Sequence, residues 1–145
     1  MNSFVIDVNI LFNALISGKK IYKTLFINKR FFTPDFALIE IEKYENVILK
    51  NAKLKEDELK DFTLALFSKL TFVPKFVIPK KIIQNAYDIC KEIDPKDTLY
   101  FALSNFLNIP LVTRDKKLKT YLNNKGISSI IYFDDFLTEF INKNQ

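Results

Sequence analysis

Short apolar runs alternate with amphipathic stretches along the chain, and this alternation predicts its secondary structure. The first run, Phe4-Val5-Ile6, is aromatic and β-branched and predicts a buried strand that ends at Asp7. Similar runs predict further strands at residues 31–33, 109–113 and 129–132, and a weak strand region around Pro74, at 72–73 and 76–78.

Helical periodicity occupies most of the sequence between these strands. We expect helices at residues 8–17, 20–28, 34–44, 54–70, 79–93, 94–106, 115–124 and 133–142. Pro34 and Pro79 suit the first turn of a helix, where a backbone N–H is not needed. Two apolar faces are expected to lie inward, namely Ile21, Leu25 and Ile27 in the second helix, and Leu59, Phe62, Leu66 and Leu70 in the fourth.

Strands that alternate with helices indicate a parallel sheet covered on both faces. We therefore predict an α/β fold, a three-layer α/β/α sandwich with a central, mainly parallel sheet. The 145 residues contain no linker-like segment, so we expect a single domain, residues 1–145. The chain has no apolar run of the roughly 18 residues that span a membrane and no basic start typical of a secretory signal. We expect no membrane partner and a cytoplasmic location.

Composition excludes several kinds of active site. The chain has no histidine, which rules out Ser-His-Asp triads, Cys-His pairs and histidine-bearing zinc sites. Its single cysteine, Cys90, can form neither an internal disulfide nor a thiolate metal cage, and its two glycines rule out glycine-rich nucleotide loops. Any metal must therefore bind to oxygen ligands. The net charge of +5 favours an anionic partner without identifying it.

Four acidic residues occupy places where a parallel α/β sheet forms its binding sites. Asp7 and Asp115 follow predicted strands, whose carboxyl ends line the binding crevice in such sheets. Asp97 lies in the first turn of a predicted helix, and Glu40 lies about two turns into the helix after the second strand. Clustered carboxylates repel one another unless a cation neutralises them, so their convergence would require a metal.

Mg²⁺ or Mn²⁺ suits such a ligand set, since both prefer oxygen ligands and are often held by a few carboxylates together with substrate phosphates. One metal can activate a water for attack on a phosphodiester, and a second, roughly 3.5–4 Å away, can stabilise the leaving oxygen. Outside these four acids the chain is strongly basic. Arg114, Lys116 and Lys117 are therefore candidates for contacts with the phosphates of a nucleic-acid backbone, without reading of its bases.

Four segments carry these acids in a recognisable order and spacing. They are Ile6-Asp7-Val8-Asn9-Ile10-Leu11, Thr33-Pro34 with Glu40 and Ile41, Asp94-Pro95-Lys96-Asp97 with Ala102-Leu103, and Leu111-Val112-Thr113-Arg114-Asp115-Lys116-Lys117-Leu118. Together they resemble the motifs of PIN-domain ribonucleases, in particular small archaeal and bacterial, VapC-like members. The resemblance extends over about residues 3–135.

The resemblance implies that Asp7, Glu40, Asp97 and Asp115 are catalytic, metal-binding acids, and that Asn9 and Thr113 support the site. It also implies cleavage of single-stranded RNA that depends on magnesium or manganese, often by a homodimer. Many small PIN proteins are toxins held by an antitoxin, so an antitoxin protein is a further candidate partner. Other members of the family process RNA in their own right.

Several of these residues also have a structural interpretation. Asp94, Asp115 and Asn9 are suited to capping helices, so Asp94 is a candidate both for a cap and for a supporting residue of the site. Thr113 can be an ordinary strand residue, and the lysines after Arg114 can form the solvated face of a helix. Glu42 and Glu45 share the helix of Glu40 but are rotated from it by about 200° and 140°, and Glu40 fits the spacing from Pro34 best.

A metal-dependent endoribonuclease is the leading hypothesis for the function. A haloacid-dehalogenase-like phosphatase also begins with an Asp at a strand end, but that family requires a second Asp at the position of Asn9. The non-enzymatic alternative is a catalytically inactive, PIN-like module that binds RNA or serves as a scaffold. The presence of all four acids argues against this alternative.

Overall fold

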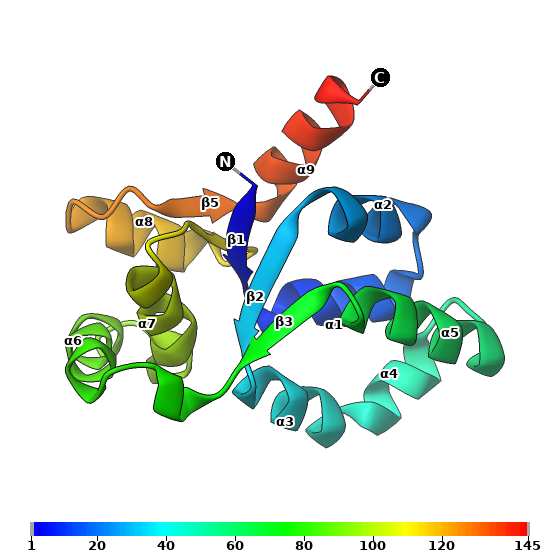
Figure 1. The fold of residues 1–145 in the computed structure, drawn as a ribbon, viewed down its shortest axis with the longest axis horizontal. Coiled ribbons are helices and arrows are strands. Elements are labelled where there is room, and N and C mark those ends of the chain that lie inside the picture. The colour runs from blue at the N-terminus through cyan, green and yellow to red at the C-terminus, as the bar shows by residue number, and fades with distance from the viewer. Residues whose placement is uncertain (1, 145) are drawn as a thin grey trace.

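The computed structural model describes residues 2–144, and within them the fold is built on one five-stranded sheet (Figure 1). The strands are β1 (Ser3–Ile6), β2 (Arg30–Pro34), β3 (Leu70–Val73), β4 (Leu111–Thr113) and β5 (Ile130–Tyr132). Their order across the sheet is β3-β2-β1-β4-β5, and all neighbours are parallel. In the centre, Val5 of β1 lies between Phe32 and Leu111. The predicted parallel sheet is confirmed.

Helices cover both faces of the sheet, which confirms the three-layer α/β/α architecture (Figure 1). One side carries α1 (Val8–Ser17), α2 (Lys20–Asn28), α3 (Phe36–Lys43), α4 (Glu45–Asn51) and α5 (Glu56–Phe67). The other side carries α6 (Lys80–Cys90), α7 (Thr98–Leu107) and α8 (Lys116–Asn124). Helix α9 (Phe133–Lys143) follows β5, and the 3₁₀ helices η1 (Lys75–Val77) and η2 (Pro95–Asp97) precede α6 and α7. Right-handed crossovers explain this division, since the chain passes from β1 to β3 in one direction and then returns to β4 and β5.

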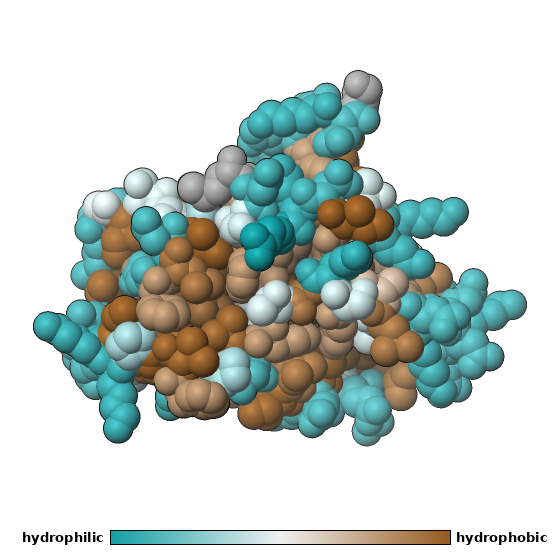
Figure 2. Space-filling model, in the orientation of Figure 1, coloured by the Kyte–Doolittle hydropathy of each residue, from teal (hydrophilic) through white to brown (hydrophobic). Residues whose placement is uncertain are grey.

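Aliphatic and aromatic side chains fill the space between the layers. Val5 of the central strand, Ile10 of α1 and Leu103 of α7 are fully buried. The ring of Phe136 in α9 meets that of Phe4 edge-on, with 4.8 Å between centroids. On the face shown in Figure 2, hydrophobic residues gather over α3, α6 and α7, and hydrophilic side chains surround them. None of the helices within residues 2–144 has the length and apolar character needed to cross a membrane.

Two predicted helix boundaries are wrong, the start at Pro34 and the end at Leu70. Pro34 is the last residue of β2 instead of the first of a helix, because a strand end also tolerates the missing N–H; α3 begins two residues later. Leu70 lies in β3, opposite Phe31, whereas α5 already ends at Phe67. Leu70 follows Leu66 at a helical spacing. The helical pattern in the sequence therefore continues beyond the residue at which α5 ends.

Two further predictions on this side of the fold are wrong, and one helix was not predicted. The weak strand region continues only to Val73, and Lys75–Val77 form η1 instead of a strand. The sequence pattern does not predict α4, which is separated from α3 by a bend at Tyr44 without glycine or proline. Ile27 is 68% exposed, so of the three residues predicted to lie inward only Leu25 and, in part, Ile21 face the core; Tyr22 and Phe26 are buried as well.

The carboxyl ends of the strands meet at one edge of the sheet, at the bottom of the view in Figure 1 for β2 and β3. Hydrogen bonds to backbone carbonyls fix these ends relative to one another. The Thr33 hydroxyl donates to the carbonyl of Ile6 (2.9 Å), and the Asp35 N–H donates to the carbonyl of Val73 (3.0 Å). The Asp7 N–H donates to the carbonyl of Val112 in β4 (3.2 Å). Residues that directly follow the strands are therefore held in defined positions along this edge.

Candidate active site

Asp7 lies where β1 ends and α1 begins, and it is only 5% exposed. One carboxylate oxygen accepts a hydrogen bond from the backbone N–H of Asn9, and the other accepts one from the hydroxyl of Thr113, both at 3.2 Å. The contact with Asn9 caps α1. Burial nevertheless raises the pKa of the Asp7 carboxyl, against the effect of both hydrogen bonds. A negative charge here is held at a free-energy cost.

Asp97 is the least satisfied acid at this edge. It ends η2 and is 8% exposed, and its Oδ2 atom is buried without a hydrogen-bond partner in residues 2–144. Burial raises the pKa of Asp97 to about 7, helped by the charges of Asp7, Asp94 and Asp115. Acids from three separate places in the chain, residues 7, 94–97 and 115, thus lie within electrostatic reach of Asp97.

Thr113 connects two of these acids through its side chain. Its hydroxyl is fully buried, donates to Asp7 and accepts the backbone N–H of Asp115 at 3.0 Å. Asp115 in turn caps α8 by accepting the N–H of Leu118 at 3.1 Å. Asp115 therefore forms the expected helix cap and also lies beside the other acids. The end of β4 holds Asp7 and Asp115 in one hydrogen-bonded unit.

Glu40 lies beside the same edge, in a neighbouring hollow. The hollow has a volume of about 360 Å³ and is lined by Glu40 and Asn9 together with Lys96. Glu40 is half-buried, whereas Glu42 and Glu45 are exposed and line a different hollow. The geometry thus favours Glu40 over its two neighbours as the glutamate nearest the acids.

Tyr100, in the first turn of α7, is a residue that the sequence patterns do not single out. It is 3% exposed, and its hydroxyl oxygen has no hydrogen-bond partner in residues 2–144. Burial raises the pKa of the Tyr100 hydroxyl, and the charges of Asp7, Glu40 and Asp97 raise it further. Tyr100 therefore lies near both the aspartates and Glu40. Its position three residues after Asp97, about one helical turn, is the signal that could have indicated it.

The remaining predicted residues surround the acids. The Asp94 carboxylate accepts the N–H of Lys96 at 3.0 Å, which confirms its role as a cap. Arg114, Lys116 and Lys117 are exposed next to Asp115. Lys116 Nζ lies 5.0 Å from the centroid of the Tyr132 ring. Burial raises the pKa of Tyr22, but the guanidinium of Arg114 lowers it, so Arg114 also lies toward α2.

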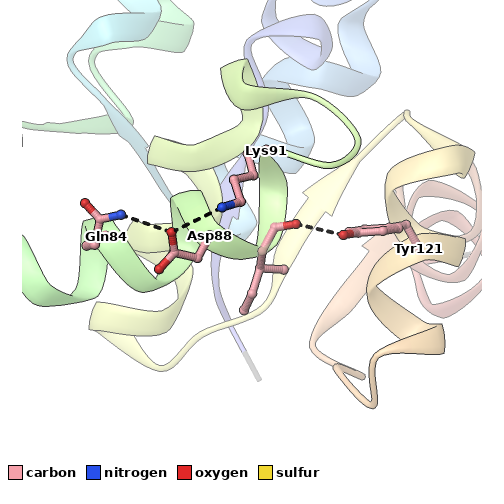
Figure 3. A network of polar contacts seen from close by, with 5 residues as sticks. Gln84, Asp88, Lys91 and Tyr121 are labelled. Atoms are coloured by element: carbon pink, nitrogen blue, oxygen red, sulfur yellow. Dashed lines mark hydrogen bonds and ion pairs between the residues drawn. The ribbon is translucent and has the colours of Figure 1, made fainter.

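Lysines do not neutralise the clustered aspartates. Within residues 2–144 the carboxylates that form ion pairs are Glu56, Asp88 and Glu139, all on the surface. Figure 3 shows one of these contacts, in which the carboxylate of Asp88 meets both Gln84 and Lys91. Asp7, Asp97 and Asp115 have no comparable partner in this part of the chain.

The donor set suits a hard divalent cation. All candidate ligands are oxygens, and the unpartnered Oδ2 of Asp97 offers a free coordination position. Within residues 2–144 no three acidic side chains lie close enough to form a ready-made metal cage. Mg²⁺ does not require such a cage, since it usually keeps several waters and binds through one or two carboxylates and substrate phosphates. Asp97, with Asp7 and Asp115, would hold the ion.

A comparison with protein families agrees with this geometry. The family model described as PIN domain matches residues 5–128. The chain belongs to the PIN domain family. The matched region contains the four predicted acids and Tyr100. PIN domains are generally nucleases and typically use divalent metals. A comparison with curated proteins finds no match.

The raised pKa of Asp97 predicts an unusual pH dependence for the stability of this PIN domain. Between about pH 4 and pH 7, folded Asp97 keeps a proton that the unfolded chain has lost, so metal-free stability falls as the pH rises. We expect Asp97→Asn to flatten this decline. At about pH 8 the free energy of unfolding of the variant should exceed that of the wild type by a few kcal/mol, since one pKa unit corresponds to about 1.4 kcal/mol. Urea unfolding across this pH range measures the effect.

A matched control and a metal titration complete this test. Asp88→Asn removes a surface carboxylate and should leave the pH profile unchanged. Mn²⁺ should stabilise the wild type at about pH 8, by about 2.7 kcal/mol at a hundredfold excess over its Kd, and should stabilise Asp97→Asn much less. Equal pH profiles for wild type and Asp97→Asn would contradict the prediction.

Proposed function

We propose that this PIN domain is a metal-dependent endoribonuclease that hydrolyses phosphodiester bonds of single-stranded RNA. The observation that carries the proposal is the group formed by the buried Asp7 and Asp97 and the half-buried Asp115, which has no ion pair with a lysine or arginine in residues 2–144. When bound, Mg²⁺ or Mn²⁺ lowers the pKa of a coordinated water and offsets the charge of a phosphate. The family supports a nuclease of this general kind.

The chain's own residues have distinct tasks in this proposal. Asp97 supplies a carboxylate oxygen that no protein group occupies, and Asp7 supplies a carboxylate whose direction is set by Thr113 and Asn9. Glu40 contributes negative charge from the neighbouring hollow. The Tyr100 hydroxyl can donate a proton in a hydrogen bond to an acceptor in the site, because no protein acceptor uses it in the described residues.

Basic residues around the acids support a nucleic-acid substrate. Arg114, Lys116 and Lys117 are exposed beside Asp115, and Lys96 lines the hollow of Glu40. Contacts of these side chains to phosphates would position an RNA strand without selecting its sequence. Their charge also offsets the repulsion between a polyanion and the acidic cluster.

We expect the purified protein to cut single-stranded RNA in the presence of Mn²⁺ or Mg²⁺ and to stop cutting in excess EDTA. Asp97→Asn should lower the cleavage rate by about a hundredfold or more, which is the scale of losing one electrostatic stabiliser of a transition state. Asp88→Asn is the matched control, since it makes the same chemical change at the surface, and it should cut like the wild type.

Cleavage that continues in EDTA, or full activity of Asp97→Asn, would contradict the proposed enzyme. The alternative is an inactive PIN-like module that binds RNA or serves as a scaffold, and the lack of a ready-made metal cage in residues 2–144 favours it. Calorimetric titration with Mn²⁺ separates the two. Absence of binding, both to the free protein and to its RNA complex, would support the module.

Thr113 offers a second test, through its contacts with two acids. We expect Thr113→Val to lower the cleavage rate by about 10–100-fold, the usual effect of losing a residue that orients metal ligands. The valine keeps the shape of the side chain but removes the donor to Asp7 and the acceptor for the Asp115 N–H. Thr113→Ser keeps the hydroxyl and should retain most of the activity. If Thr113→Val folds and cuts as fast as Thr113→Ser, the hydroxyl does not orient the acids.

We further propose that a protein partner covers an apolar hollow next to α4 and α5, either a second copy in a homodimer or an antitoxin. The hollow measures about 640 Å³, and its apolar lining residues are Leu15, Ile41, Ile48, Leu49, Leu59 and Leu64. Leu49 is 47% exposed and Leu64 is 70% exposed. Exposed apolar side chains that lie together at one hollow favour an interaction site. Glu42, Glu45 and Glu56 on its border favour a partner with basic residues at the rim.

Light scattering tests the homodimer. The wild type should have the mass of a dimer, and Leu64→Glu should shift it to a monomer because a charge would be buried at the interface. Ile27→Glu is the control, since Ile27 is 68% exposed on α2 and should not affect the mass. A wild type that is monomeric at all concentrations contradicts the homodimer. A small protein encoded beside this chain and retained by the wild type but not by Leu64→Glu would then identify the antitoxin.

A further inference from the structure

The most exposed large hydrophobic side chain in residues 2–144 lies on the same sheet edge as the acids. It is Phe76, which is 88% exposed and has no aromatic partner in the described residues. Phe76 belongs to η1, the short helix that directly follows β3 and Pro74. In Figure 1 this segment is the green turn between β3 and α6 at the bottom of the view.

The residues before and after Phe76 in the sequence hold it in an exposed position. The flanking residues Val73 and Ile78 are buried, and they anchor the segment to the core. Between them, the Val77 N–H donates to the carbonyl of Pro74 (3.1 Å), and the Ile78 N–H donates to the carbonyl of Lys75 (3.0 Å). The exposure of Phe76 therefore results from an ordered turn, and its ring is available to a ligand without rearrangement.

The surroundings of Phe76 are basic. Phe76 borders a hollow of about 520 Å³ that is also lined by Lys75 and Lys80, with Asp35 as its acidic residue. The lysines that form ion pairs within residues 2–144 are Lys60, Lys91 and Lys143, so both lysines of the hollow remain available to phosphates. An aromatic ring beside free lysines is the combination that binds single-stranded nucleic acid, by stacking on bases and by contacts with the backbone.

Phe76 lies close enough to the acids for one continuous RNA strand to contact both. β3 is separated from β1 by β2, so the end of β3 lies two strand spacings, about 10 Å, from the end of β1 at Asp7. RNA that crosses the carboxyl edge of the sheet at the acids can thus extend along this edge to the turn of Phe76. We propose that Phe76 is a base-stacking subsite for the RNA substrate, with Lys75 and Lys80 as its phosphate contacts. This inference rests on the proposed function, since it extends the same substrate along the edge.

The absence of tryptophan from the chain permits a direct test. Phe76→Trp keeps an aromatic ring and introduces the only indole, whose fluorescence is quenched when a base stacks on it. We expect a short, mixed-sequence, single-stranded RNA to quench this fluorescence in EDTA, where metal-dependent cleavage does not interfere. An abasic strand of the same length should quench it far less. Ile27→Trp places an equally exposed indole on α2 and should not respond.

The contribution to affinity is measured by anisotropy with the same labelled RNA in EDTA. Phe76→Ala should weaken binding about tenfold, within the range for the loss of one stacked base, and Phe76→Trp should restore it. Unchanged affinity of Phe76→Ala, absence of RNA binding, or an unquenched indole in a saturated complex would each overturn the subsite. A blue shift of the indole with rising protein concentration, without an effect of RNA, would instead assign Phe76 to self-association.

The outcomes for the subsite and for the enzyme are separable. Quenching together with an absence of metal-dependent cleavage would show that Phe76 stacks on bound RNA and would refute the nuclease. Metal-dependent cleavage by the wild type, with unchanged binding and KM for Phe76→Ala, would refute the subsite and leave the nuclease. If both hold, Phe76→Ala should raise KM about tenfold and affect kcat much less, because Phe76 contacts the substrate away from the scissile bond.

Discussion

The structure depends on a balance between a well-packed sheet and a group of carboxylates that it buries without compensation. Asp7 is 5% exposed and Asp97 8% exposed, and the chain supplies neither of them with a cationic partner in residues 2–144. Burying such charges opposes folding, and apolar residues of the central strands, such as Val5 and Val112, must offset it. A fold that retains this penalty is arranged for a ligand that removes it.

The order of the strands explains why the acids meet. β1 lies in the middle of the sheet, so the residue after it is next to the residues that follow both β2 and β4. The hydroxyl of Thr33 holds the end of β1 from one side, and that of Thr113 holds Asp7 from the other. Asp97 belongs to η2, directly before α7, in the helical layer on the other face of the sheet from α1. Three independent connections thus place the aspartates, and a shift in any one of them would change the charge density at the site.

The sequence predicts those parts of the fold that carry local signals. Helix α1 has the predicted bounds because Asp7 caps its first turn and Gly18 ends it with a φ of 62°, a conformation that glycine adopts without strain. Helix α4 and the strand at Leu70 lack such signals, since no glycine or proline separates them from the preceding helical pattern. The acids could be placed from their positions after strands. The burial of Tyr100 and the exposure of Phe76 depend on tertiary packing, which spacing alone does not determine.

The charges divide the carboxyl edge into a region that needs a cation and regions that supply one. Lys75 and Lys80 line a hollow beyond β3, and Lys116 and Lys117 follow β4, whereas the buried aspartates lie between these groups. A lysine placed within ion-pair distance of Asp97 would neutralise its charge permanently and exclude other cations from the site. In the proposed nuclease, a polyanion would bind to the lysines at the rim, while the centre would depend on a diffusible ion. The separation of fixed and exchangeable positive charge would then make the proposed chemistry at the centre conditional on the metal, while binding along the rim would not depend on it.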